Sequence, residues 1–351
     1  MKQEAIAKLN GIIEEGRKNM IATIVDITKE FQVRKDYITR PETLDYSVTS
    51  HGVELILAGT EYGLTNHALS QLYAKAGIPK VFADRVSKLQ EYGLLRSMLS
   101  RLNNKVNEKG ILLRIVENTV KGVLSPSYFR LDASPLFEGF IERSLDAGFV
   151  PYRGMNTDYR YQISFLLPEV FELGQSEYVV FGLSLTTGDY GSQALQISVI
   201  ALRIWCSNLA VGTDIFRKVH IGKRFELLEN VIELSAATVE LDTKTLISGI
   251  GDVVDNSLKY IREIKTVIAK STDAEIDLKK ALSDFRKRGM SQEVAAKVEL
   301  LYETDQPLEV LPQKSNAWRL SNCISYLAKS ERGDKRIDLE NMAFEVLDQA
   351  A

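Results

Sequence analysis

The sequence predicts an α+β protein whose antiparallel sheet core, of β-α-β-β-β type, lies between a helical N-terminal hairpin and a helical C-terminal third. Segments rich in β-branched and aromatic residues, which are typical of strands, fall between residues 111 and 205. Apolar residues at helical spacing precede this region and follow it almost to the end of the chain. Strands and helices do not alternate regularly, as a doubly wound parallel sheet would require. We therefore expect three parts, residues 1–110, 111–224 and 225–351.

The first part is expected to hold a strand pair and a helical hairpin. Apolar residues within 6–13 indicate a short helix, and the pattern of 45–58 predicts two strands. Thr65 can cap the start of a helix that Pro79 ends. Apolar residues at helical spacing over 86–102 predict a second helix, which should pack against the first.

The central part is expected to form the sheet. Its strand-like segments are 111–123, 158–167, 178–185 and 194–205. A helix between the first two begins at Asp132 or Ser134, since Pro135 suits its first turn, and Gly148 ends it. The segment Thr186–Ser192 has the glycines and the aspartate of a hairpin turn, so the strands on either side of it should pair antiparallel.

The last part is expected to be helical. Helices are predicted over 227–232, 253–268, 276–285, 318–327 and 339–347. Thr272 and Glu275 form a capping box at the start of the third of these helices. Two prolines within 303–315 predict a loop before the last two.

The composition and motifs argue against a catalytic, metal-binding or membrane role. With 3 histidines and 2 distant cysteines, the chain lacks the close ligand set of a structural zinc site. Phosphate-binding loops and nucleophile motifs are absent, and no apolar run reaches the roughly 18 residues of a membrane helix. The few cysteines and the lack of an export signal predict a reducing compartment, the cytoplasm. We expect no catalytic residue, no cofactor, no metal and no membrane association.

Aromatic residues beside arginines mark one candidate nucleic-acid site. In the second predicted strand, alternation places Tyr159 and Tyr161 on the core-facing side and Arg160 on the other. Near the start of this strand Tyr159, with Tyr152 and Arg153, can lie exposed, where rings stack on bases and arginines contact phosphates. Packing in the core is the alternative, and it is the favoured interpretation for Tyr161.

The densest basic run in the chain is a second candidate. It has the sequence RKVHIGKR and carries four positive charges without an acid, on Arg217, Lys218, Lys223 and Arg224. The net charge of the whole chain is -3, so nucleic-acid binding would depend on a local stripe of this kind. A solvated surface between the sheet and the helices is an equally good interpretation.

Four segments taken together resemble a family of phage and plasmid proteins. They are Tyr62–Pro79 (YGLTNHALSQLYAKAGIP), Val120–Asp132 (VKGVLSPSYFRLD), Leu202–Leu209 (LRIWCSNL) and Asn316–Leu327 (NAWRLSNCISYL). In this order they are similar to the phage/plasmid-like proteins gathered as the domain of unknown function family numbered 932. Leu209 stands where that family usually has a glycine after the Cys-Ser-Asn step, so the turn there should be built differently.

This resemblance implies an accessory protein of a mobile element, and it carries over no catalytic residue. The predicted core also resembles the compact fold of phage single-strand annealing recombinases, which form rings and bind unpaired DNA along a basic groove. That likeness implies four groove residues, Arg114, Lys121, Tyr128 and Arg130, the last two in a turn expected to be exposed. An ordinary polar sheet edge is the alternative for each of them.

Two functions therefore stay open. The leading expectation is a non-catalytic, self-associating protein in the cytoplasm of a bacterial host. It would bind single-stranded DNA and promote strand annealing during recombination or replication of a phage or plasmid. The alternative is a phage-encoded structural or host-interaction protein that binds a phage or host protein and no nucleic acid.

Overall fold

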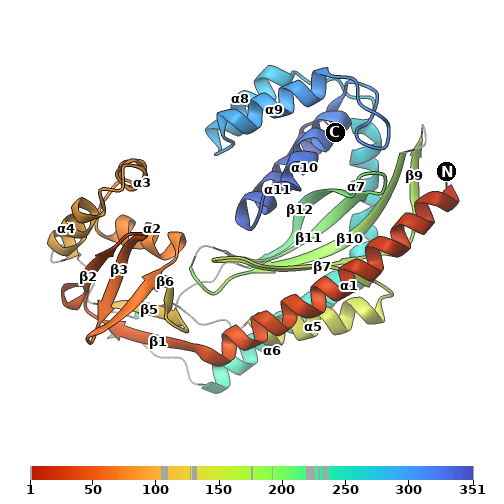
Figure 1. Cartoon of the computed structure of the whole chain (residues 1–351). Helices are drawn as coiled ribbons and strands as arrows, with labels where there is room; N and C mark the ends of the chain where they lie inside the picture. The colour runs from red at the N-terminus through yellow and green to blue at the C-terminus, as the bar shows by residue number, and fades with distance from the viewer. Residues whose placement is uncertain are drawn as a thin grey trace.

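The chain folds around two separate sheets, one in an N-terminal domain and one in a larger domain that holds most of the helices (Figure 1). This computed structural model describes residues 2–103, 110–126, 128, 133–174, 177–191, 193–218, 226–227, 230–231 and 236–350. Helices follow the second sheet over the C-terminal third of the chain. The predicted α+β class is therefore confirmed.

The first domain is a mixed sheet covered by three helices. Its strands, in sheet order, are β1 (Arg34–Thr39), β5 (Ile111–Val116), β6 (Thr119–Leu124), β4 (Thr60–Leu64), β3 (Gly52–Leu57) and β2 (Asp45–Thr49). Neighbouring strands run antiparallel, except that β4 and β6 are parallel. The helices are α2 (Asn66–Lys75), α3 (Lys80–Lys88) and α4 (Tyr92–Asn103), and a 3-10 turn, η1 (Pro41–Thr43), joins β1 to β2.

Local signals predicted much of this domain. The strand pair expected over 45–58 is β2 and β3, and the Thr65 hydroxyl accepts a hydrogen bond from the backbone N–H of Ala68 at the start of α2. The second predicted helix is instead two helices, α3 and α4. Gln90 lies between them with a φ of 59°, a conformation that an α-helix cannot contain.

The second domain is built on an antiparallel sheet. Its strands, in sheet order, are β12 (Asn208–Lys218), β11 (Leu195–Arg203), β10 (Glu177–Thr187), β8 (Tyr161–Leu166) and β7 (Val150–Asn156), with β9 (Phe171–Gly174) paired to β10. The predicted hairpin turn joins β10 to β11, which pair antiparallel. The helices α5 (Ala133–Asp146), α6 (Ala236–Asp255) and α7 (Ser257–Ser271) pack against these strands.

The strand-like run 111–123 lies in a different place from the one expected. It is a hairpin, β5 and β6, turned at Glu117 with a φ of 54°, and it completes the first sheet. Its apolar side chains, such as Leu113 and Val123, join the core beneath α2 and α4. The boundary expected at residue 110 is therefore wrong, and the first domain continues through Leu124.

The N-terminal helix α1 (Lys2–Val33) lies along the edge strand β7 of the second sheet (Figure 1). The approach is close, because a Cβ at Gly16 would meet the carbonyl oxygen of Tyr152 at 2.0 Å. The Asn19 side chain accepts a hydrogen bond of 2.8 Å from the backbone N–H of Gly154. The helix thus covers a strand edge that would otherwise be open to pairing with other chains. The sequence predicted only a short helix here.

The C-terminal third contains α8 (Leu278–Lys287), α9 (Gln292–Glu303), α10 (Ala317–Ala328) and α11 (Asp334–Gln349), with α10 and α11 against β12. The helix predicted over 227–232 is wrong, because β13 (Glu226–Leu227) pairs with β14 (Asn230–Val231). The predicted loop is present between α9 and α10. Among the helices of the described residues, none combines the length and the apolar character needed to cross a membrane.

Two buried arginines hold that loop in place. Arg319, 2% exposed, donates to the carbonyl oxygens of Leu301, Tyr302, Thr304 and Pro312. Arg203 pairs with Glu177 at 2.6 Å and also donates to the carbonyl oxygens of Leu308 and Val310. Both arginines belong to segments that carry the family resemblance, and their contacts give these segments a structural role.

Candidate nucleic-acid interface

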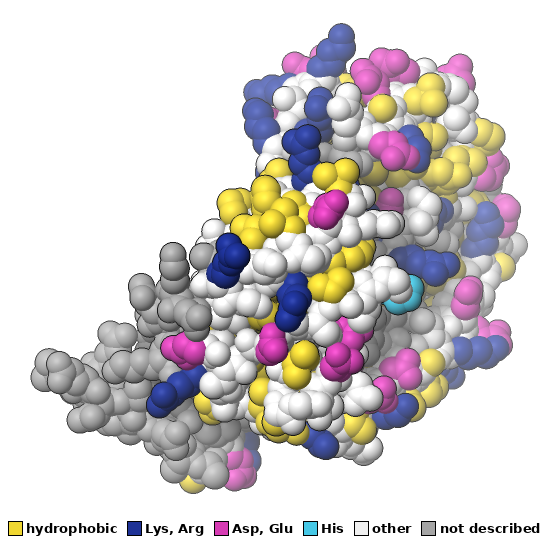
Figure 2. All heavy atoms as spheres, turned by 60° about the vertical axis from the view of Figure 1, so that its left-hand side comes forward, with side chains coloured by type: hydrophobic (Ala, Val, Ile, Leu, Met, Phe, Trp, Pro, Cys, Tyr) yellow, Lys and Arg dark blue, Asp and Glu magenta, His cyan; other side chains and the backbone are white. Residues whose placement is uncertain are grey.

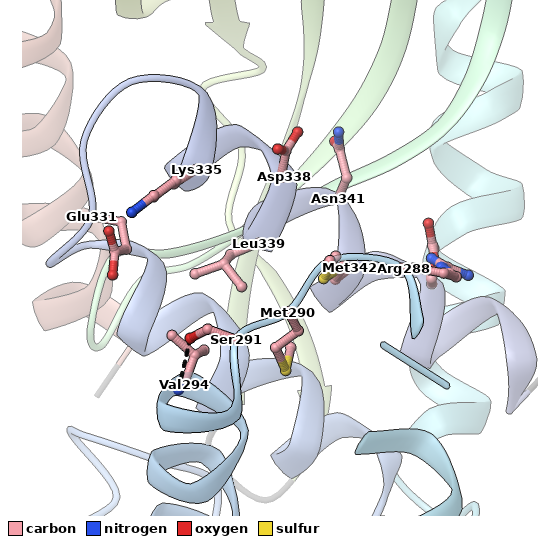
Figure 3. Close-up of a pocket in the computed structure, with 12 residues that line it drawn as sticks. Arg288, Met290, Ser291, Val294, Glu331, Lys335, Asp338, Leu339, Asn341 and Met342 are labelled. Carbon is pink, nitrogen blue, oxygen red and sulfur yellow. Dashed lines mark hydrogen bonds and ion pairs between the residues drawn. The ribbon is translucent and has the colours of Figure 1, made fainter. Parts of the chain in front are cut away.

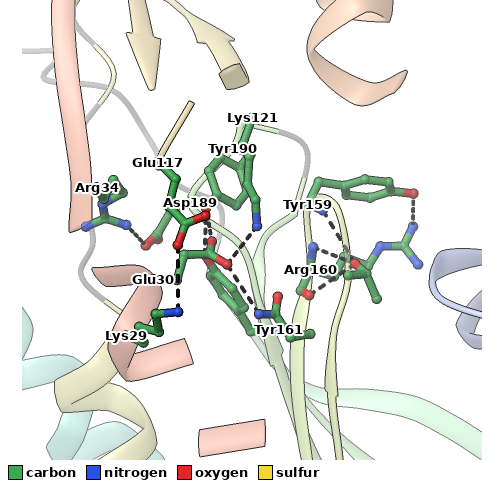
Figure 4. Close-up of polar contacts among 12 residues, drawn as sticks. Lys29, Glu30, Arg34, Glu117, Lys121, Tyr159, Arg160, Tyr161, Asp189 and Tyr190 are labelled. Carbon is green, nitrogen blue, oxygen red and sulfur yellow. Dashed lines mark hydrogen bonds and ion pairs between the residues drawn. The ribbon is translucent and has the colours of Figure 1, made fainter. Parts of the chain in front are cut away.

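The two domains meet at a joint of buried charged groups (Figure 4). The chain passes from α1 into β1 without a linker. Arg34, the first residue of β1, pairs with Asp189 of the β10–β11 turn at 2.6 Å. Arg114 of β5 pairs with Asp36 at 2.8 Å and donates to the carbonyl oxygen of Asp189. The hairpin tip of the second domain is thereby fixed against the first sheet.

Glu30, near the end of α1, is the centre of a second cluster at this joint (Figure 4). Its carboxylate accepts hydrogen bonds from the hydroxyls of Tyr161 and Tyr190, and it pairs with Lys121 of β6 at 2.7 Å. Burial favours the protonated acid, but the charge of Lys121 and the three hydrogen bonds outweigh it and lower the pKa of Glu30. The side chain is therefore a carboxylate at neutral pH, and it joins both domains.

A wide cleft opens beside this joint, with a volume of about 1520 Å³. One wall is formed by α2 and α3 of the first domain, and the other by residues 156–160 and 330–335 of the second. Figure 2 shows it as a hollow beside the first domain. The basic side chains that line it are Lys80, Lys88, Lys121, Arg160, Arg332 and Lys335, and the acidic ones are Asp84, Asp158, Glu331 and Asp334. Basic side chains therefore line both walls of this interdomain cleft, although the net charge of the whole chain is -3.

An aromatic stack lies in the cleft where the two domains meet. The rings of His67 and Tyr159 are 4.7 Å apart and inclined by 27°. The Arg160 guanidinium lies 4.8 Å from the Tyr159 ring centre, and His67 Nε2 is 2.9 Å from the carbonyl oxygen of Tyr190. Burial lowers the pKa of His67, so the ring is neutral at neutral pH. The stack presents uncharged aromatic surface between cations of both domains.

Three of the residues predicted from the sequence line this cleft, namely Lys121, Tyr159 and Arg160. Both cations among these three residues have acidic partners. Lys121 pairs with Glu30, and Arg160 pairs with Asp338 at 2.7 Å and with Asp334 at 3.5 Å. They contribute to the shape of the cleft more than to its free positive charge.

Three other predicted residues are buried and cannot contact a strand in this conformation. Arg114 is 0% exposed, and Asp36 balances its charge inside the joint. Arg153 lies beneath α11, where it binds both carboxylate oxygens of Glu340 at 2.6 Å. Tyr152 is buried against α1. These residues are therefore corrections to the predicted interface.

The remaining predicted residues lie elsewhere or outside the described part. Tyr128 is half-buried beside Arg114, with its ring centre 5.7 Å from the guanidinium. Arg217 is exposed near the end of β12, away from the interdomain cleft. The described residues do not include Arg130, Lys223 and Arg224, nor the side chain of Lys218. Tyr161 is buried in the core, which confirms the interpretation favoured for it.

Four cations of the cleft were not predicted from the sequence. Lys80, Lys88, Arg332 and Lys335 are exposed, and none has an ion-pair partner among the described residues. No dense basic run identifies them, because they come from two segments far apart in the sequence and join one site only when α3 faces residues 330–335. In the part of the chain that the structure describes, no group of histidines, cysteines and acids is placed to hold a metal ion.

Compared with protein-family models, curated proteins and solved structures, the chain matches none of them. The resemblance of its four segments to family 932 therefore stays a prediction. The structure adds one observation about these segments. Gln71 of the first segment contacts Val123 of the second and Tyr190, and Asn208 of the third segment donates to Asn322 of the fourth.

Proposed function

We propose that this protein binds a single strand of nucleic acid in the interdomain cleft, without catalysis. The family resemblance suggests DNA, and a role in strand annealing or strand protection during recombination or replication of a phage or plasmid. Self-association on the strand belongs to the same proposal. The bacterial cytoplasm would be its place of action.

The observation that carries this proposal is the cleft itself. Its volume of about 1520 Å³ exceeds the roughly 300–1000 Å³ of pockets that enclose small ligands, so a polymer suits it better than a metabolite. Cations that have no ion-pair partner in the described part of the chain lie on both walls, Lys80 on one and Lys335 on the other. The stacked rings of His67 and Tyr159 lie between them. Cations along a groove together with aromatic surface are the usual means of holding an unpaired strand.

We expect the protein to bind a labelled oligothymidylate with an affinity that falls as salt is raised. Each neutralised phosphate should contribute about 0.7 to the slope of log affinity against log salt, because binding releases counterions from a single strand. The double variant Lys80→Ala with Lys335→Ala should lower that slope by about 1.4 and weaken binding about tenfold or more. Fluorescence anisotropy at several salt concentrations measures both quantities.

A charge-matched control separates this site from general electrostatic attraction. Lys259 of α7 and Lys279 of α8 are exposed and line none of the hollows described here. Replacing both with alanine removes the same charge and should leave binding unchanged. Absence of oligothymidylate binding by the wild-type protein at low salt contradicts the proposed function, and equal binding of a duplex contradicts its preference for single strands.

A second function, protein binding, is supported by an apolar patch on the first domain. Val81, Phe82, Leu89 and Leu94 of the α3–α4 region are 83%, 41%, 67% and 47% exposed. Figure 2 shows hydrophobic side chains gathered on this domain. Large exposed apolar groups that cluster on one surface are typical of protein contacts. This surface fits the alternative of a phage or host partner, and it also suits self-association.

If the patch mediates self-association, Val81→Asp with Leu89→Asp should convert a larger species to the monomer. A charge inserted into an apolar contact loses its hydration without gaining a partner, so the contact is weakened. Sedimentation velocity of the wild type and the variant measures the change. A wild-type protein that is monomeric at every concentration contradicts this prediction.

A further inference from the structure

The interdomain cleft continues into a second hollow at the end of the second sheet. This sheet-end groove, of about 460 Å³, is bounded by the β10–β11 hairpin, β12 and α11. Arg160 lines both the interdomain cleft and the sheet-end groove, so the two meet at this side chain. At the other end of the groove, Arg217 of β12 is exposed and has no ion-pair partner among the described residues. An arginine therefore stands at each end of the groove.

The lining between the two arginines suits a polar chain. Hydroxyl and amide side chains face the groove from Thr186, Gln193, Gln196, Ser198 and Asn341. Two acids, Glu345 and Asp348, also line the groove. The charge of Glu345 is balanced by its ion pair with Arg288. Amides and hydroxyls can donate to phosphate oxygens or exchange hydrogen bonds with base edges. The Gln193 amide already donates to the Ala194 carbonyl and the Gln196 side chain, and Thr186 and Ser198 are buried. The groove therefore has a polar wall, and Arg217 at its far end has no ion-pair partner among the described residues.

A third hollow on another side of α11 is less suited to a polyanion (Figure 3). It has a volume of about 430 Å³, and Met290, Leu339 and Met342 contribute apolar groups to its lining. Its acids outnumber its bases, with Glu331, Asp338 and Glu345 against Arg288 and Lys335. A strand that leaves the interdomain cleft is therefore favoured to pass through the sheet-end groove.

We propose that the bound strand runs from the interdomain cleft past Arg160 and along the sheet-end groove to Arg217. This inference rests on the proposed function and adds the direction and the length of the binding track. Arg217 would contact a phosphate that a strand filling only the cleft does not reach. The affinity contributed by Arg217 should therefore depend on the length of the strand.

Oligothymidylates of about 5 and about 15 nucleotides, lengths within the range that single-strand sites cover, test this track. Arg217→Ala should weaken binding of the longer strand about fivefold and lower its salt slope by about 0.7, because one phosphate contact is lost. Binding of the shorter strand should not change. Arg262→Ala, which removes an exposed arginine from α7, is the control and should affect neither length.

The outcomes separate the track from the function on which it rests. Unchanged binding of the longer strand by Arg217→Ala overturns the track while leaving the cleft as a binding site. An equal loss for both lengths overturns it as well, because Arg217 would then belong to the minimal site. If the wild type binds neither oligonucleotide, the proposed function fails and the track fails with it.

Discussion

Arg319→Met is expected to lower the free energy of unfolding by about 4 kcal/mol, the largest loss we predict for one substitution. The buried guanidinium donates to four carbonyl oxygens, two of which, on Leu301 and Tyr302, belong to the last turn of α9. Methionine fills similar space but cannot donate, so these carbonyl groups lose their donors beside a buried side chain. Urea unfolding followed by the fluorescence of Trp205 and Trp318 measures the loss, since both tryptophans are buried in the second domain.

Two further variants show whether geometry or charge matters at this position. Arg319→Lys keeps the charge but cannot donate to carbonyl groups on several sides, so it should recover only part of the stability. Arg262→Met is the control, because that arginine is exposed on α7 and a surface change of this kind has little effect. An unfolding midpoint of Arg319→Met equal to that of the wild type would show that the loop does not depend on this guanidinium.

Glu30→Ala is expected to destabilise the protein at neutral pH by about 3 kcal/mol. The substitution leaves the half-buried Lys121 ammonium without its counterion and removes the acceptor of the Tyr161 and Tyr190 hydroxyls. Because this cluster joins the domains, the chain at the joint should also be cleaved faster by a protease in the variant than in the wild type. Glu14→Ala on the exposed side of the same helix removes a surface pair with Lys18 and should have no measurable effect.

The effect of Glu30→Ala should depend on pH in a direction that follows from the lowered pKa of Glu30. A carboxylate whose folded pKa lies below its ordinary value of 4.5 stabilises the folded state fully above that value. The stabilisation is lost as the pH falls through the folded pKa. Wild type and variant should therefore differ most at neutral pH and converge in acid. A difference in unfolding free energy that grows as the pH falls below 4.5 would contradict this account.

Local chemistry explains which parts of the fold were predictable. The Thr65 cap, the hairpin turn over 186–192 and the proline-containing loop before α10 each depend on a few neighbouring residues, and each is present. The run 111–123 was misplaced because all residues of β5 are buried, so its sequence lacks the alternation that would show which face meets a core. The sheet that such a run joins is decided by contacts far away in the sequence.

The candidate site was less predictable for the same reason. An arginine in a sequence carries no sign of the acid that will neutralise it. Arg114 meets Asp36, 78 residues away, and Arg153 meets Glu340, 187 residues away. Conversely, Lys80 and Lys335 lie far apart along the chain and come to face the same cleft. Among the predicted residues that the structure describes, Tyr159, Arg160 and Lys121 lie there.

The position of α1 sets an order in which the protein can be assembled during synthesis. The helix is synthesised well before the strand that it covers, because β7 follows only after the whole first domain has been made. The first sheet can close once β6 has emerged, whereas α1 must wait with Leu9, Met20 and Ile27 uncovered. A nascent chain of this kind displays an apolar helix to chaperones until β7 is translated and the helix docks on it.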